Sequence, residues 1–234
     1  MDSAQTVICV VSRDAAGVSV RRSTATNGEP LYTVELSGVR CDPSAILAEG
    51  ARGADALQYA VQVTSLAVSA LCLGASERAL SLTAAYVAER HQFGRPIGTF
   101  QAVSQRAADA YIDLLAMEVS LSQAAFRLQE GLPAAREVAI ARLTAIEGAH
   151  RIVMACQHLH GGIGFDRDYP LHRSLLWVKR LEFSVGGSET QLDRLGSLLV
   201  DVDGDGPLED PSPSTATTTS ASLRVGHLSD REPT

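Results

Sequence analysis

The chain has 234 residues and a mass of 24.7 kDa, enough for one substantial domain with an additional segment. Hydrophobic residues make up 45%, charged residues 20% and aromatic residues 5%, a composition typical of a folded, helix-rich soluble protein. The net charge of −7 argues against a polyanionic partner such as nucleic acid. From Asp201 onward, seven acids and two arginines give −5, so the first 200 residues carry only −2.

Four cysteines are scattered along the chain and form no CxxC or CxxxC pair: Cys9, Cys41, Cys72 and Cys156. This spacing argues against a zinc site and against a disulfide framework, and it predicts reduced core residues in a cytoplasmic protein. The N-terminus has no basic stretch followed by an apolar one, and polar side chains interrupt the apolar run 61–75. We therefore expect neither a signal peptide nor a membrane span.

Residues 1–52 form the first compositional region, which is β-like. Apolar or alternating runs separated by turn signals predict short strands over 6–12, 18–22 and 31–39. Three such strands bury little by themselves. We expect this partial β domain to pack against the rest of the chain or another subunit.

Residues 53–200 have helical periodicity and predict a mainly α fold, an antiparallel four-helix bundle. The first helix is expected from Ala54 to about Arg90, with Asp55 favourably placed near its start. The second is expected over 99–129, the third from Pro133 to His158, and the fourth over 170–183 and 188–200. The inner stripes of the second and third helices are Val103, Ala107, Tyr111, Leu114, Leu115, and Ala139, Leu143, Ile146, Val153. Residues 201–234, rich in Ser, Thr and Pro, predict a disordered acidic tail.

The loops between the helices have two possible interpretations each. The glycine run 160–164 is typical of a helix stop, and a close approach of backbone to a flat or anionic ligand is the alternative. Arg90 and Arg95 flank Phe93-Gly94, so this loop is either a solvated helix end or a phosphate clamp. The sequence contains no GxSxG, HExxH, P-loop or GxGxxG motif that would indicate a self-contained active site.

Three histidines and the single tryptophan also have local interpretations. His150 falls in register with the inner stripe of the third helix, which favours a hydrogen-bonded core histidine over a catalytic base. His158 and His160 are two residues apart and do not share a helix face, which disfavours a joint metal site. Trp177 and the leucines around it are expected in the core.

Three segments together resemble the signatures of the acyl-CoA dehydrogenase family. Residues 88–101, AERHQFGRPIGTFQ, are similar to its RxxFG…Q signature; HGGIG at 160–164 with YPLHR at 169–173 is similar to the second; and GGSETQ at 186–191 is similar to the third. The resemblance spans residues 5–200. It implies that 1–52 correspond to the closing strands of the family's central β domain and 53–200 to its C-terminal helical domain.

The resemblance implies an FAD-dependent oxidoreductase of lipid metabolism, in which a carboxylate removes the α-proton of an acyl-CoA thioester. It implies FAD contacts, shared across a subunit interface, by Arg90, Gln92, Phe93, Gln101, Gly161, Gly162, Gly186 and Gly187. His158 stands where the family usually has a glutamine that contacts FAD.

The catalytic position departs from the family pattern. The glutamate that usually precedes the last glycine pair is Val185 here, and a valine cannot accept a proton. The alternative position on the first helix, within 62–65, also lacks an acid. Glu182 and Glu189 are the nearest acids that could substitute as the base. The sequence also contains no counterpart of the family's N-terminal helical domain or of the first part of its β domain.

These departures are similar to those of the non-catalytic subunits of actinobacterial heteromeric acyl-CoA dehydrogenases. We therefore expect a subunit that completes the FAD site of a homologous catalytic partner, in an assembly expected to be tetrameric. Two alternatives stay open. One is a structural or assembly remnant that binds no flavin, and the other is an independent enzyme whose base is unrecognised, such as Glu182.

Overall fold

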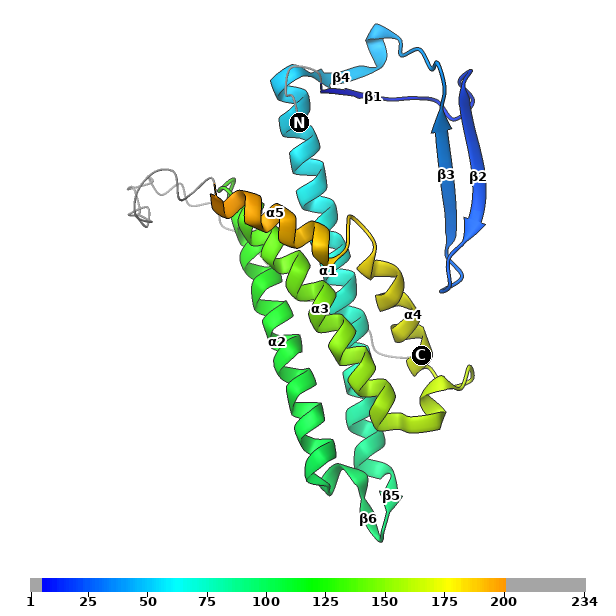
Figure 1. The fold of residues 1–234 in the computed structure, drawn as a ribbon, viewed down its shortest axis with the longest axis vertical. Helices are drawn as coiled ribbons and strands as arrows, with labels where there is room; N and C mark the ends of the chain where they lie inside the picture. The colour runs from blue at the N-terminus through cyan, green and yellow to red at the C-terminus, as the bar shows by residue number, and fades with distance from the viewer. Residues whose placement is uncertain (1–5, 201–234) are drawn as a thin grey trace, which may run out of the picture.

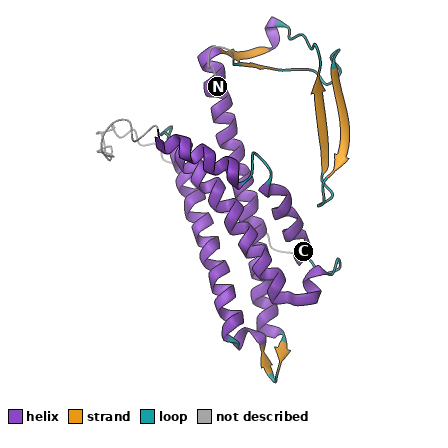
Figure 2. Cartoon of the chain, viewed as in Figure 1, coloured by secondary structure: helices purple, strands orange, loops and turns teal. Residues whose placement is uncertain are grey.

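The computed structural model describes residues 6–200, and the predicted tail lies outside them (Figure 1). Helices dominate this part of the chain, and strands occur in the N-terminal region and in one small hairpin (Figure 2). The helices are α1 Gly50–Glu89, α2 Gln101–Gln129, α3 Ala135–His160, α4 Leu171–Glu182 and α5 Ser188–Val200.

The helices form the expected antiparallel bundle, with α3 at its centre. α3 packs against α1, α2, α4 and α5, while α1 also packs against α2 and α4. α4 and α5 together take the place of the fourth helix, and the chain breaks between them at Gly186-Gly187. The mainly α fold predicted from the periodicity is therefore confirmed.

Small side chains allow the helices of the bundle to approach closely. A Cβ at Gly148 of α3 would lie 2.9 Å from the Sδ of Met117 on α2. On α1, the buried hydroxyls of Ser69, Ser76 and Thr83 each donate to the carbonyl four residues earlier, which satisfies them without a partner on another helix. α1 also has an 18-residue window of mean hydropathy 1.5, long and apolar enough to span a bilayer by length and composition alone, and 22% of this window is buried within the chain.

The N-terminal strands form two separate antiparallel pairs. β1 Val7–Cys9 pairs with β4 Ile46–Glu49 beside the start of α1, and β2 Val18–Thr24 pairs with β3 Pro30–Leu36. The β2–β3 hairpin stands away from the bundle, and an ion pair of 3.3 Å between Glu29 and Arg180 joins its turn to α4 (Figure 1). The three predicted strands are present. β4 was not predicted, because four residues are too short to show a pattern.

Several helix boundaries differ from the prediction. α1 begins at Gly50, directly after β4, so Asp55 lies in its second turn. α2 begins at Gln101, because residues 97–99 form a 3₁₀ turn, η3. α3 begins at Ala135 and extends to His160. The boundary between the β region and the helical domain, placed after residue 52 from the sequence, stays a prediction.

The predicted inner stripe of α2 is partly wrong. Its buried residues are Ala110, Met117 and Ala124, whereas Tyr111 and Leu115 are exposed. These three residues are spaced seven apart and mark a narrow stripe of contact with the bundle, so the other apolar residues beside it stay at the surface. Trp177 is not in the core either: it is 40% exposed, because α4 packs only one of its faces against α1 and α3.

Candidate functional site

A short β-hairpin with a two-residue turn connects α1 to α2 and projects from the end of the bundle (Figure 1). β5 His91–Gln92 pairs with β6 Arg95–Pro96, and the turn residues Phe93 and Gly94 both have positive φ, 53° and 80°. Such turns favour Asn or Gly, so a phenylalanine in the left-handed region is strained. The Phe93 side chain is 93% exposed, and its ring is nearly perpendicular to that of Phe100, with ring centroids 6.2 Å apart. The hairpin thus presents an aromatic ring to an approaching molecule.

Cationic and polar residues flank Phe93 in the hairpin and at the adjoining helix ends. Arg95 places its guanidinium 4.3 Å from the centroid of Phe100. Arg90, the C-cap residue directly after α1, and Gln92 are exposed. Gln101 is the exposed first residue of α2, where unpaired backbone N–H groups favour negative charge. This end of the bundle therefore suits a ligand with both an aromatic and an anionic part.

The glycine run ends α3, as predicted. Gly161 has φ 63°, and the chain continues as a 3₁₀ turn, η4 Gly161–Phe165. Gly161 and Gly162 are exposed, and a Cβ at either would meet no described atom within 4 Å. His158, in the last turn of α3, is also exposed. Open backbone at this position is compatible with the close approach of a ligand, which stays a prediction.

A cluster of one buried histidine, His160, with Tyr86 and Tyr169 joins the glycine run to α1. The sequence did not predict this cluster. The ring of His160 stacks on Tyr86, with centroids 4.4 Å apart. Its Nδ1 lies 2.8 Å from the carbonyl of Cys156 and its Nε2 lies 3.0 Å from the hydroxyl of Tyr169. These partners assign the proton to Nδ1 and an acceptor role to Nε2. Burial lowers the pKa of His160, which agrees with a neutral ring. The cluster holds the hairpin and the glycine run at the same end of the bundle.

The loop between α4 and α5 lies at the other end of α4 (Figure 1). Val185 and Gly186 both have positive φ, 60° and 89°. Val185 is β-branched and therefore strained there, and the Nε2 of Gln191 donates to its carbonyl over 2.9 Å. Twelve residues of α4, about 18 Å of helix, separate this loop from the glycine run. The predicted site residues thus fall into two groups, with Val185, Gly186 and Gly187 apart from the others.

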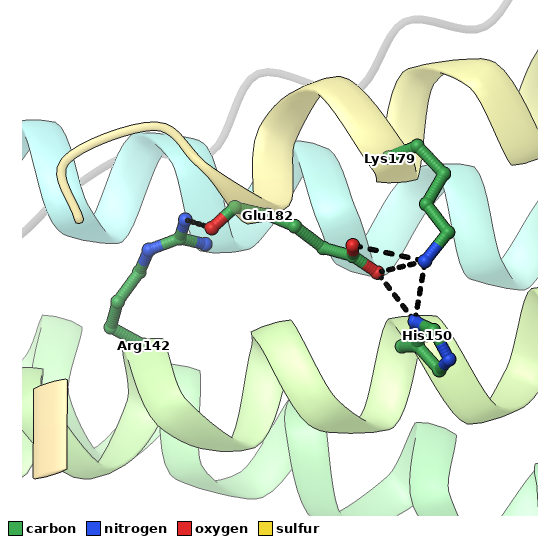
Figure 3. Close-up of polar contacts among 4 residues, drawn as sticks. All are labelled: Arg142, His150, Lys179 and Glu182. Atoms are coloured by element: carbon green, nitrogen blue, oxygen red, sulfur yellow. Dashed lines mark hydrogen bonds and ion pairs between the residues drawn. The ribbon is translucent and has the colours of Figure 1, made fainter. Parts of the chain in front are cut away.

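A fully buried arginine fixes the backbone that leads into this loop. Arg142 of α3 donates to the carbonyls of Leu181, over 2.6 Å, and Ser184, over 2.7 Å. It also lies 3.4 Å from the carbonyl of Glu182 (Figure 3). Desolvation lowers the pKa of Arg142, and nearby Cys72 and Glu182 oppose that shift. The cation caps the carbonyl end of α4. In the sequence, the only indication of this buried cap is that an arginine, Arg142, stands within the apolar stripe of a predicted helix.

The side chain of Glu182, which lines a cleft, meets two basic side chains (Figure 3). Its carboxylate lies 3.1 Å from the Nζ of Lys179 and 2.9 Å from the Nδ1 of His150. The cleft has a volume of about 660 Å³, lies between α3 and the α4–α5 corner, and is also lined by Glu189. The prediction that His150 lies in the core is wrong. Its side chain is 46% exposed, because the α4–α5 corner leaves this part of α3 uncovered. Its predicted hydrogen bonding is confirmed.

The cysteine prediction is correct for two of the four residues. Cys72 and Cys156 are buried in the bundle, and desolvation raises the pKa of both thiols. Cys9 and Cys41 lie outside the core with their sulfur atoms 3.0 Å apart, because the β1–β4 ladder brings their segments together. Among residues 6–200, no group of three or more His, Cys, Asp and Glu side chains is placed to hold a metal ion.

Comparison with known proteins links these loops to one family. The sequence model of the acyl-CoA dehydrogenase C-terminal domain matches residues 51–199. Acyl-CoA dehydrogenase FadE27 of Mycobacterium tuberculosis is 39% identical over 208 residues, which cover 86% of this chain and 54% of that protein. The chain thus spans about half the length of the curated relatives it matches.

Two solved structures share both sequence and fold with this chain. The ChsE4-ChsE5 complex from Mycobacterium tuberculosis contains a chain that is 39% identical, with a TM-score of 0.77 and coverage of 83% of this chain and 52% of that one. A variant of the Tcur3481-Tcur3483 steroid ACAD is 38% identical, with a TM-score of 0.78 and coverage of 85% and 53%.

Proposed function

Because this chain belongs to the acyl-CoA dehydrogenase family, we propose that it is a subunit of an FAD-dependent enzyme that desaturates an acyl-CoA thioester between Cα and Cβ. In this proposal the chain supplies contacts for FAD at the interface with a homologous subunit, and the partner supplies the catalytic base. The assembly is a cytoplasmic heteromer, and we propose a tetramer.

The observation that carries the proposal is the conformation of Phe93. A left-handed phenylalanine costs about 1–3 kcal/mol, and a side chain that is 93% exposed regains little of it within its own chain. Strain at an exposed aromatic residue indicates a role in binding rather than in folding. A flat ring beside arginines suits stacking on an adenine next to a pyrophosphate.

The residues at this end of the bundle fit the FAD that the family uses. Arg90, Gln92 and Gln101 would bind anionic and polar oxygens, and Phe93 would pack on the adenosine. The absence of a Cβ at 161 and 162 leaves open space around the backbone there. His158 is exposed nearby, whereas Gly186 and Gly187 belong to the other end of α4 and would contact a different part of a bound cofactor. When bound, FAD would accept the hydride that leaves the β-carbon.

Val185 supports the division of labour between subunits. Its apolar side chain cannot remove the α-proton, and the backbone around it is held by Gln191. Exposed apolar residues along α1 and α2 support a large protein interface: Tyr59, Val63, Leu71, Tyr111, Ile112 and Val119. The two-component ChsE4-ChsE5 relative supports a heteromer. The steroid ACAD relative supports a bulky, steroid-type acyl-CoA as the substrate class of the assembly.

The visible absorption spectrum of the purified chain tests the proposal. The chain is to be purified alone and after co-expression with a homologous full-length acyl-CoA dehydrogenase subunit. We expect flavin absorption only in the co-purified complex. Flavin bound by the chain alone would favour the independent enzyme, and its absence from both samples would leave a structural remnant.

A substitution at the hairpin turn tests the role of Phe93 separately from folding. Asparagine tolerates the left-handed conformation, so Phe93→Asn should leave the thermal midpoint of the chain unchanged or higher. The flavin content of the complex should fall at least several-fold. Phe126→Asn is the matched control, because Phe126 is also exposed but lies 25 residues further along α2 than Gln101, about 37 Å away. Equal flavin content in both variants would refute the role of Phe93.

One observation favours a second candidate, the independent enzyme. Glu182 is a nearly buried carboxylate that lines a cleft, as a general base would. Its oxygens, however, already contact Lys179 and His150. Turnover by the chain alone that disappears in Glu182→Gln and persists in Glu189→Gln, on the rim of the same cleft, would support this candidate. Unchanged turnover in Glu182→Gln would exclude Glu182 as the base.

A further inference from the structure

Cys9 and Cys41 are paired by the fold although they lie 32 residues apart in the sequence. Cys9 ends β1, and Cys41 lies in the segment that leads from β3 to β4. Their sulfur atoms are 3.0 Å apart, Cys41 is exposed and Cys9 is half-buried. No argument from sequence spacing could detect this pair, because it depends on the register of the β1–β4 ladder.

The backbone beside both sulfur atoms is held in place. The N–H of Val10 donates to the carbonyl of Ala45 over 3.0 Å, and Cys9 is the ladder partner of Ile46. On the other segment, Asp42 caps the 3₁₀ turn η2, Pro43–Ala45, by accepting from the backbone N–H of Ser44 over 2.8 Å. A disulfide bond has a length of about 2.05 Å, so the sulfur atoms must approach by about 1 Å. We expect side-chain rotation to supply this movement, since the backbone on both sides is held by the ladder and the 3₁₀ turn.

We propose that Cys9 and Cys41 form a reversible intramolecular disulfide, a modification site in the N-terminal β region. With hydrogen peroxide as oxidant, the thiolate of one cysteine attacks a peroxide oxygen, the O–O bond breaks, and a sulfenic acid and one water result. The thiolate of the second cysteine then attacks the sulfenic sulfur, the S–S bond forms and a second water leaves. The two thiols lose two electrons and two protons, and one peroxide becomes two waters.

The bond would join the two segments that connect the β2–β3 hairpin to the bundle. Residues 10–40 would become a closed loop that contains the whole hairpin. Val18, Val20, Tyr32 and Val34 of this hairpin line an apolar hollow of about 450 Å³. Cross-linking its two connectors would restrict local opening of the ladder and keep this hollow in one orientation relative to α1.

The chain contains its own controls for such an oxidation. Cys72 and Cys156 are fully buried, so peroxide reaches their thiols only when the bundle opens locally, which makes both slow to react. Trypsin sites also separate the cysteines conveniently. Cleavage after Arg13, Arg40 and Arg52 releases Cys9 in peptide 1–13 and Cys41 in peptide 41–52.

The test is peptide mapping of the full chain after treatment with hydrogen peroxide and alkylation of the remaining thiols. We expect peptides 1–13 and 41–52 to appear as one species, lighter than their sum by two hydrogens, and to separate on reduction. Cys9→Ser and Cys41→Ser should each abolish it, whereas Cys156→Ala should not. In the native oxidised chain, cleavage by trypsin after Arg21 or Arg22 should be about tenfold slower than in the reduced chain.

Three results would overturn the proposal. The first is four alkylated thiols after peroxide treatment of the folded chain. The second is a cross-link that joins two copies of the chain, which would show as a dimer on a non-reducing gel. The third is a 1–13/41–52 species whose formation leaves the rate of cleavage after Arg21 unchanged, since the bond would then not restrain the hairpin.

Discussion

Arg142 is the residue whose replacement tests the physical description of the α4–α5 loop most directly. Arg142→Met keeps a side chain of similar length in the apolar interior and removes the guanidinium. Two short charge-assisted hydrogen bonds, to the carbonyls of Leu181 and Ser184, would be lost. Bonds of this kind contribute about 1.5–3 kcal/mol each, so the gross loss is about 3–6 kcal/mol.

Two effects reduce this loss. Removing a buried cation also removes its desolvation cost, which is of the order of kcal/mol. The carbonyl of Leu181 keeps a second donor, the N–H of Ser184 at 3.0 Å, and half-buried Ser184 leaves its own carbonyl within reach of water. We therefore expect a net loss of about 2–3 kcal/mol in the free energy of unfolding. For a chain of this size that lowers the thermal midpoint by about 4–12 °C.

Urea denaturation followed by circular dichroism measures the effect. Arg142→Lys keeps the charge and part of the hydrogen bonding, so it should lose less than Arg142→Met. Arg136→Met is the matched control on the same helix: Arg136 forms a partly exposed ion pair of 2.9 Å with Glu137, which contributes about 1 kcal/mol or less. If Arg142→Met is as stable as the unmodified chain, desolvation outweighs the hydrogen bonds and the capping role of Arg142 is refuted.

The remaining predictions concern His160 and two glycines of α1. Because burial lowers the pKa of His160 below its ordinary value of 6.5, its contribution to stability is complete above about pH 6.5 and is lost as the pH falls through the folded pKa. The thermal midpoint of His160→Gln should therefore vary less between pH 8 and pH 5 than that of the unmodified chain. The thermal midpoint of His158→Gln should keep the pH dependence of the unmodified chain. Gly74→Ala should raise the free energy of unfolding, measured by urea denaturation, by about 0.5–1 kcal/mol, since its Cβ meets open space among the described residues. Gly53→Ala should lower it, because a Cβ there would lie 2.6 Å from the carbonyl oxygen of Thr6.

Local patterns predicted the elements of the bundle well. The helical period and the glycines at 161 and 186–187 located α3, α4, α5 and the breaks between them to within a few residues. Such features depend on neighbours three or four residues away, which the sequence displays directly. The chemistry of the loops followed from their resemblance to a family, because no local rule distinguishes a binding glycine run from a helix stop.

Exposure and long-range contacts were predicted poorly, and for a common reason. The helical register places His150 on the same face as Ile146, but only the path of the α4–α5 corner decides that His150 lies at a cleft mouth. Arg142 finds its carbonyl partners some 40 residues later, and Cys9 finds Cys41 32 residues later. These contacts follow from packing and strand register, which periodicity does not encode.

The two groups of candidate site residues have separate buried anchors, and both anchors belong to α3. His160 fixes the glycine run at one end of α4, and Arg142 fixes the loop with Val185 at the other. Each anchor works through backbone carbonyls or a single hydroxyl, so its effect should stay local. Hydrogen exchange should therefore show faster exchange at Gly187–Gln191 in Arg142→Lys with the glycine run unchanged, and the opposite pattern in His160→Gln. Faster exchange at both ends in either variant would mean that α4 transmits the change, and that the two loops act as one site.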